Sequence, residues 1–139
     1  MSWEGKYVGL PYAENGRASD GADCWGLACL VYAQELGILL PAYVGVACST
    51  EVAEIAGFVE HERMQGPWIA VGEPRPFDLL VFRRGRYPSH IGIATSQPSM
   101  MLHMDGADQA KIVRWSDTRW SHRFIGPFRH LQRALKGAS

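Results

Sequence analysis

The sequence predicts an α+β fold in which N-terminal helices pack on an antiparallel β-sheet of about five strands. Three observations lead to this prediction. Apolar residues recur at helical spacing between Asp23 and Leu36. From Phe77 onward the pattern changes to short β-like runs separated by Gly, Pro, Asp or Gln. The connections between these runs are short, which suits hairpins rather than the long crossovers that parallel strands need.

Helices are expected in the first half of the chain. The opening segment reads mostly as loop, with a short helical turn around Trp3 to Gly9. The first helix spans about Asp23 to Leu36 and ends at a plausible cap, Gly37. A second helix starts at Ser49 or Thr50, and four apolar residues share its inner face: Val52, Ile55, Ala56 and Val59.

Strands are expected in the second half. Four runs alternate in the manner of short strands, and a fifth is a candidate: residues 77–85, 89–96, 99–105, 110–116 and 125–129. The second and third runs, "SHIGIATS" and "SMMLHMD", are close enough to form a hairpin.

Composition limits the class of protein. The chain has 139 residues, which is the size of one domain (residues 1–139), and 47% of them are hydrophobic, enough for a real core. Lys and Arg together number 14, as do Asp and Glu, so the net charge is zero. A neutral chain gives no general argument for nucleic acid as a partner.

The cysteines and the N-terminal residues indicate in which cellular compartment the protein is made. Three cysteines without a CxxC pair argue against a disulfide scaffold. No apolar run approaches the roughly 20 residues needed to span a bilayer. The start, "MSWEGKYVGLPY", lacks the basic and apolar blocks of a signal peptide. We therefore expect synthesis in a cytoplasm without export by that route.

Cys24 stands in the first turn of the first expected helix. The positive end of the helix dipole and the N–H groups of that turn stabilise a thiolate. A cysteine at this position is therefore a candidate nucleophile.

Two histidines complete a candidate catalytic set with Cys24. His90 opens the second strand and His103 lies near the end of the third. In a hairpin, both histidines can lie on one face of the sheet. If the first helix packs on that face, Cys24 meets His90 and His103 lies behind it. This is the arrangement of a nucleophile, a base and an orienting group.

Each of these residues alone has a more ordinary explanation. A cysteine near a helix start is more often buried filler, and a histidine in a strand is usually a half-buried residue with satisfied hydrogen bonds. One Cys and two His could also bind zinc, although none of them is close to another in sequence. The remaining cysteines and histidines carry no motif: Cys29 is expected in the core, Cys48 in a connector, His61 on a solvated helix face, and His122 and His130 near the C-terminal end.

Four motifs resemble one family. "DCWGL", "PFDLLVF", "SHIGIA" and "MLH" occur in the order seen in the NlpC-type cell-wall peptidases, a bacterial branch of the papain-like cysteine peptidases. The resemblance implies a papain-like α+β domain that cleaves amide bonds in peptidoglycan stem peptides without a metal or other cofactor. It also implies Cys24 as nucleophile, His90 as base and His103 as orienting residue.

The resemblance extends to the substrate site. Tyr12 and Asp23 match family positions that line this site, and Trp25 stands where the family often has Ser, at a position that shapes the pocket. Phe77 stands where Gly is usual, which is tolerable if the position does not need a positive φ.

Peptidases of this type encoded in phage tail modules and gene-transfer-agent clusters resemble the chain most fully, through "ELGILLPAY" and "IGPFRH". This implies a tail component, held by tail-tip or baseplate hub proteins, that opens the host wall during genome delivery. The alternative is a structural tail-tip part with weak or no activity. In that case an exposed tryptophan could anchor a neighbouring protein, the candidates being Trp3, Trp68, Trp115 or Trp120, although core packing is the commoner use of tryptophan.

Overall fold

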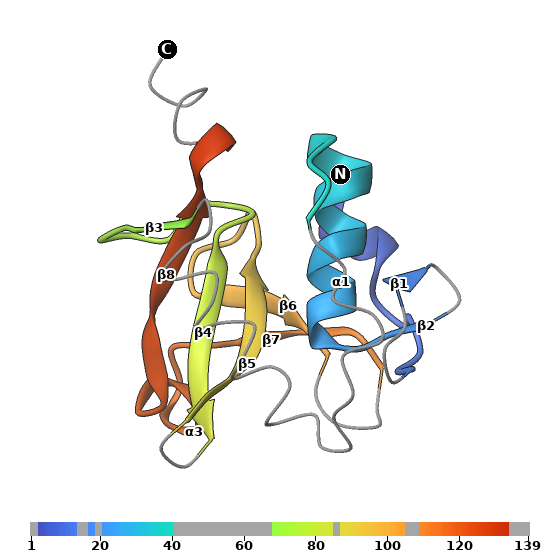
Figure 1. Cartoon of the computed structure of the whole chain (residues 1–139). Helices are drawn as coiled ribbons and strands as arrows, with labels where there is room; N and C mark the ends of the chain where they lie inside the picture. The colour runs from blue at the N-terminus through green and yellow to red at the C-terminus, as the bar shows by residue number, and fades with distance from the viewer. Residues whose placement is uncertain are drawn as a thin grey trace.

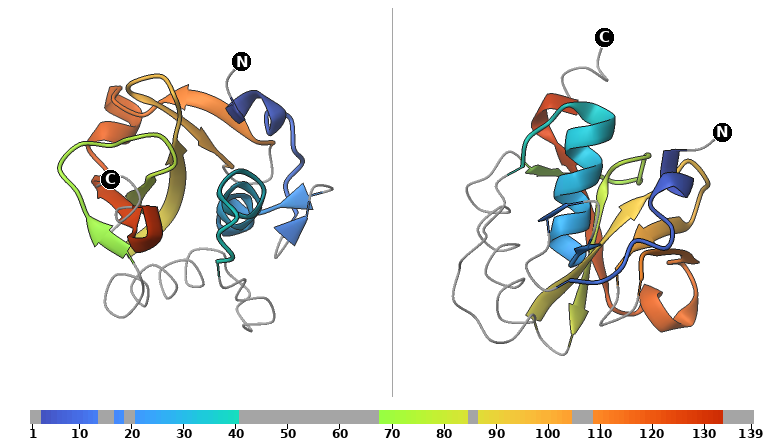
Figure 2. Two further views of the ribbon diagram at one scale, coloured as in Figure 1. Left: turned by 90° about the horizontal axis from the view of Figure 1, so that it is seen from above. Right: turned by 90° about the vertical axis from the view of Figure 1, so that its right-hand side faces the viewer.

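The computed structural model describes residues 3–13, 17–18, 21–40, 68–84, 87–104 and 109–133. Its main helix stands beside a curved antiparallel sheet (Figures 1 and 2). The helical segments are η1 (Trp3–Lys6), α1 (Cys24–Val31), η2 (Tyr32–Leu36) and α3 (Thr118–Ser121). The strands are β1 (Arg17–Ala18), β2 (Gly21–Ala22), β3 (Trp68–Ala70), β4 (Leu79–Arg84), β5 (Tyr87–Ala94), β6 (Met100–His103), β7 (Lys111–Arg114) and β8 (Phe124–His130).

The large sheet has the strand order β3-β8-β4-β5-β6-β7, and each pair of neighbours is antiparallel. The five strands expected from the sequence correspond to β4 through β8, so the predicted α+β class is confirmed. The described strands include one more than expected in this sheet, because β3 pairs with the end of β8. β1 and β2 form a separate two-stranded sheet ahead of α1.

The first helix begins and ends where the sequence predicts. The carboxylate of Asp23 caps its N-terminus and accepts a hydrogen bond of 2.8 Å from the N–H of Gly26. The helix continues through η2, and Gly37 ends it with a left-handed φ of 67°. The second expected helix lies outside the described residues.

The two faces of the sheet carry separate apolar clusters. Residues on α1 pack with alternate residues of the central strands: Leu79, Val81, Ile91, Ile93 and Leu102. The residues between them face the other side and pack against Trp120 of α3: Leu80, Phe82, Ala94 and Met101. The period-two alternation of a strand produces this division. The helices α1 and α3 therefore cover opposite faces of the sheet.

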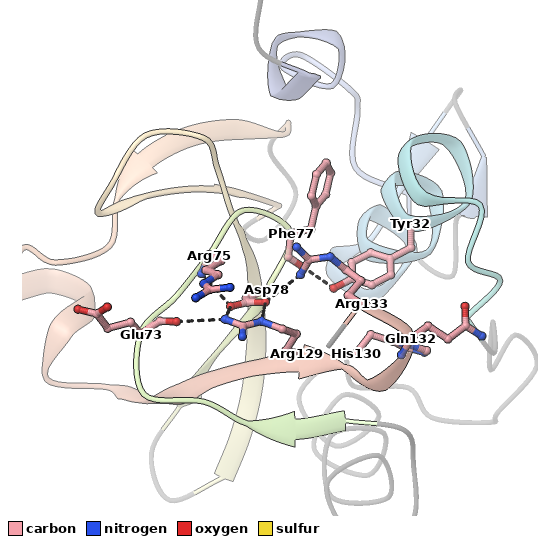
Figure 3. Close-up of polar contacts among 9 residues, drawn as sticks. All are labelled: Tyr32, Glu73, Arg75, Phe77, Asp78, Arg129, His130, Gln132 and Arg133. Carbon is pink, nitrogen blue, oxygen red and sulfur yellow. Dashed lines mark hydrogen bonds and ion pairs between the residues drawn. The ribbon is translucent and has the colours of Figure 1, made fainter. Parts of the chain in front are cut away.

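A buried carboxylate fastens the C-terminal end of β8 to the start of β4 (Figure 3). Asp78 is fully buried and accepts two hydrogen bonds from Arg129, at 3.0 and 2.8 Å. Arg133 donates a third at 2.9 Å, and the backbone N–H of Arg75 a fourth at 2.8 Å. Two guanidinium groups thus neutralise one buried carboxylate, which is the condition for burying a charge at acceptable cost.

Phe77 corrects one expectation from the sequence. Its φ is 76°, so the position does need the left-handed backbone that Gly adopts without strain. Neighbouring groups hold this conformation. Its N–H donates to the carbonyl of Ala94 at 2.8 Å, and its own carbonyl accepts the hydroxyl of Tyr32. Its ring stacks on Trp3 with centroids 4.3 Å apart. Phe is therefore tolerated here because of these contacts, although the φ is positive.

Candidate active site

Cys24 is the first residue of α1, and its side chain is buried. Oδ1 of Asp23, the N-cap residue, accepts a hydrogen bond from the N–H of Gly26. The backbone carbonyl of Asp23 accepts one from the N–H of Leu27 at 2.8 Å. The backbone N–H of Cys24 lies at the positive end of the helix dipole. The sequence prediction for the position of this thiol is confirmed.

His90 and His103 lie side by side on neighbouring strands and are both buried. The Nε2 atom of His90 is 2.9 Å from the Nδ1 atom of His103, within hydrogen-bond distance. The predicted hairpin of β5 and β6 and the shared face of the two histidines are both confirmed.

A glycine lies opposite His103 on the neighbouring strand. His103 pairs across the strands with Gly92, so His90 is its diagonal neighbour. The side chain of Met101 occupies the space over Gly92. A Cβ atom at Gly92 would lie 2.4 Å from the Sδ atom of Met101, so this face of the hairpin has no room for one.

The hydrogen bond also decides which atom of His90 can act as a base. Nε2 lies within hydrogen-bond distance of His103, so exchange of a proton with a substrate or a thiol falls to Nδ1. When His103 accepts at Nδ1, Nε2 of His90 carries its hydrogen and Nδ1 is an acceptor. A histidine partner can therefore fix the tautomer of the base as a carboxylate would.

The packing of α1 differs from the expectation. The helix contacts β5, but its body packs on the face opposite to that of the two histidines. The reason is the alternation along β5, which turns Ile91 and Ile93 toward the helix and His90 away from it. Any pairing of Cys24 with His90 thus depends on the first turn of α1 and not on the helix body.

Comparison with known proteins decides the family. A family model described as the NlpC/P60 family matches residues 9–129, which is most of the chain. The chain belongs to the NlpC/P60 family. No curated protein sequence matches the chain.

Solved structures of the family share the fold. An NlpC/P60 family protein from Bacillus cereus is 20% identical to this chain, with a TM-score of 0.66. The matched region covers 92% of this chain and 38% of the Bacillus cereus chain. A Staphylococcus aureus protein, described as similar to a lipoprotein of the NLP/P60 family, is 24% identical with a TM-score of 0.64, covering 92% and 39%. This chain therefore spans about two fifths of either protein. The NlpC/p60 domain of the peptidoglycan hydrolase SagA is 23% identical with a TM-score of 0.56, covering 90% and 89%.

The three residues expected at the substrate site lie in different surroundings. Tyr12 is half-buried and forms an isolated parallel bridge with Ala22, next to Asp23. Asp23 is the helix cap described above. Trp25 is only 2% exposed and lies in the apolar cluster around α1, so it is a core residue of this NlpC/P60 chain.

Other candidates from the sequence carry no catalytic feature. Cys29 packs against the apolar cluster around α1, as expected, and Cys48 and His61 lie outside the described residues. His130 is buried beside Trp68, and His122 is exposed after α3. Within the described ranges, no three His, Cys, Asp or Glu side chains are grouped closely enough to hold a metal ion. No helix in the same ranges is both long and apolar enough to cross a membrane.

The four tryptophans considered as exposed anchors pack against apolar neighbours instead, which is the commoner use of tryptophan. Trp68 and Trp120 are buried, and Trp3 and Trp115 are half-buried against apolar neighbours. Sequence reasoning missed that Trp120 packs against His90 and His103. The only local signal was Asp117, which caps the four-residue helix α3.

Proposed function

We propose that this NlpC/P60 chain is a cysteine endopeptidase that hydrolyses amide bonds in the stem peptides of peptidoglycan. The observation that carries the proposal is the buried 2.9 Å hydrogen bond between His90 and His103, in a chain whose cysteine begins the main helix. This pair has the composition and the tautomer control of a catalytic base and its orienting partner.

The reaction starts with a proton transfer. The Cys24 thiol gives its proton to Nδ1 of His90, and the thiolate attacks the carbonyl carbon of the amide. The backbone N–H of Cys24 donates to the oxyanion that forms, a contribution of roughly 3 kcal/mol by the usual cost of losing such a donor. As the C–N bond breaks, His90 returns the proton to the leaving amine.

Hydrolysis of the thioester completes the cycle. A water molecule loses a proton to Nδ1 of His90 and attacks the acyl carbon. The C–S bond breaks, the carboxylic acid product leaves, and the thiol of Cys24 is restored by the same proton. His103 stays bound to Nε2 of His90 throughout and stabilises the imidazolium that forms in each half-reaction.

The substrate side of the proposal uses residues next to the thiol. Tyr12 and Asp23 line the approach to Cys24 and bind polar groups of the stem peptide, as their family positions imply. Trp25 shapes the same region from inside the core, where it supports the first turn of α1.

We infer further that the enzyme acts as a tail component of a phage or a gene transfer agent and opens the cell wall locally during genome delivery. Its partners are then tail-tip or baseplate hub proteins. Support comes from the sequence resemblance in "ELGILLPAY" and "IGPFRH" to tail-encoded peptidases.

Digestion of purified peptidoglycan tests the proposal. Gram-negative and Gram-positive walls are treated with the wild type, Cys24→Ala and the matched control Cys29→Ala, and products are identified by mass spectrometry. New stem-peptide fragments from the wild type and Cys29→Ala, but none from Cys24→Ala, are the expected result. Fragments from Cys24→Ala would reject the nucleophile. No fragments from any protein, on walls or with assembled tails, would favour the structural tail-tip role.

A further inference from the structure

Trp120 lies against both histidines of the candidate site. Its indole stacks on the ring of His90, with centroids 5.0 Å apart and planes 22° from parallel. The ring of His103 stands nearly perpendicular to it at 5.1 Å and to His90 at 5.1 Å. The three centroids therefore form a nearly equilateral triangle, and the hydrogen bond between the imidazoles runs along one side of it.

The backbone around Trp120 is fixed. Asp117 caps α3 and accepts hydrogen bonds from the N–H groups of Arg119 at 3.0 Å and Trp120 at 3.4 Å. The carbonyl of Trp120 accepts the N–H of Arg123 at 3.0 Å. The carbonyl of Arg123 accepts the N–H of Arg83 on β4 at 2.8 Å, which joins this turn to the sheet.

Side chains enclose the indole on its remaining sides. Phe82 meets it edge to face at 5.3 Å and also lies 6.1 Å from His90. The guanidinium of Arg123 lies over the indole at 4.7 Å, and that of Arg119 at 5.8 Å. Arg123 is held there because its Nε and Nη2 atoms donate to the carbonyl of Arg119, at 3.2 and 3.1 Å. Trp120 is consequently only 4% exposed.

We infer that Trp120 is a positioning residue for catalysis, an inference that rests on the proposed function of Cys24 and His90. Its indole fixes the plane of the His90 ring by parallel stacking, so that Nδ1 keeps one direction. It also excludes water from the bond between His90 and His103. Water competes for both nitrogens, so exclusion strengthens the bond and preserves the reactive tautomer.

Three variants test this inference: Trp120→Leu, which loses the stacking face, Trp120→Phe, which keeps one, and Trp115→Leu as matched control. Trp115 lies on the same side of the sheet and packs against Phe124. Misorientation of a base acts on the chemical step, so we expect Trp120→Leu to lower kcat by about 10- to 100-fold with KM within about twofold. Trp120→Phe should recover most of kcat, and Trp115→Leu should leave both constants near wild type.

A second readout does not depend on activity. The proton shared by His90 and His103 is followed by proton NMR and assigned by its loss in His103→Ala. In Trp120→Leu we expect this signal to broaden through faster exchange with water, while Trp115→Leu keeps the wild-type signal. Trp120→Phe gives an intermediate exchange rate and remains informative if the leucine variant does not fold.

The outcomes separate this inference from the proposed function. If the proton of the His90–His103 pair exchanges with water at the wild-type rate in Trp120→Leu, the positioning role is overturned, whether or not the enzyme cleaves peptidoglycan. If the leucine variant does not fold, the same result in Trp120→Phe overturns it. An inactive wild type in which Trp120→Leu still broadens the proton signal would reject the peptidase and keep the positioning of the pair. If the wild type is active and Trp120→Leu has the same kcat, the positioning role is overturned and the peptidase assignment stands.

Discussion

His90 and His103 are diagonal neighbours on β5 and β6, and Nε2 of His90 lies 2.9 Å from Nδ1 of His103. The contact therefore depends on the hairpin register. A slip of one residue of β6 against β5 would turn His103 to the other face of the sheet, away from His90. The chemistry proposed for the chain thus rests on backbone pairing as much as on the identity of the two residues.

Replacing His103 tests the orienting role. We expect His103→Ala to lower kcat by about 10²-fold, because His90 loses the partner that fixes its tautomer. His103→Asn keeps a polar atom near Nε2 of His90 and should recover part of this loss. Steady-state kinetics on isolated stem peptides measures both. If the alanine and asparagine variants lose activity equally, hydrogen bonding to His90 is not what His103 contributes.

Asp78→Asn should destabilise the fold by about 3–5 kcal/mol, because two guanidinium groups then lack their buried counter-charge. Urea unfolding followed by fluorescence measures this. Glu73→Gln is the control, since Arg129 hydrogen-bonds to its backbone carbonyl and not its carboxylate. That variant should remain within about 0.5 kcal/mol of wild type. A small effect of Asp78→Asn would mean that the C-terminal arginines contribute little to stability.

Alanine variants are usually more stable than glycine variants, and we expect the opposite order at Phe77. Both substitutions remove the ring stacked on Trp3, but only glycine also removes the strain of a φ of 76°. We therefore expect Phe77→Gly to be more stable than Phe77→Ala by about 1 kcal/mol, measured by urea unfolding. An alanine variant as stable as the glycine variant would show that the left-handed backbone costs nothing here.

The buried hydroxyl of Tyr32 leads us to expect that the free energy of unfolding falls at alkaline pH. Burial raises the pKa of Tyr32 above its ordinary value of 10.0, since the hydroxyl is enclosed where it donates to the carbonyl of Phe77. Because the pKa of Tyr32 is higher in the folded than in the unfolded protein, its contribution to the free energy of unfolding is fully present below pH 10. This contribution is lost as the pH rises above 10. The loss follows a slope of about 1.4 kcal/mol per pH unit from this group.

The comparison variant is Tyr32→Phe, which should be about 1 kcal/mol less stable at pH 8 because it lacks the hydrogen bond. Its deficit should close, and then reverse, as the pH rises above 10. Thermal or urea unfolding at several pH values gives both curves. A constant difference between the two proteins at all pH values would exclude titration of Tyr32 as the cause.

The features that sequence predicted well are the local ones. The helix from Cys24 was visible because an apolar stripe runs from about Asp23 to Leu36 and ends at Gly37, and Gly37 caps the helix in the structure. The strands carrying His90 and His103 were visible from their short apolar runs and turn residues. Their common face followed from the hairpin, since the side-chain period of a strand is two.

The features that sequence missed depend on tertiary contacts. β3 has three residues, too few to show alternation, and exists because it pairs with β8. The face on which α1 packs depends on whether Ile91 or His90 points toward the helix, and the alternation alone permits both. The positive φ of Phe77 has no signal in its own residue type. Trp120 lies on α3, and β7 comes between it and His103 along the chain, so only the fold could place the two side by side.

The most direct test of the account is the reactivity of Cys24 compared with that of Cys29 in the same helix. Iodoacetamide is added at pH 6 and the two thiols are followed by peptide mapping, in the wild type and in His90→Gln. An activated thiolate predicts that Cys24 reacts at least about 10-fold faster than Cys29, although it is the more buried of the two, and that His90→Gln removes this advantage. If Cys24 reacts no faster than Cys29, or if His90→Gln leaves its rate unchanged, the pairing of thiol and imidazole is contradicted.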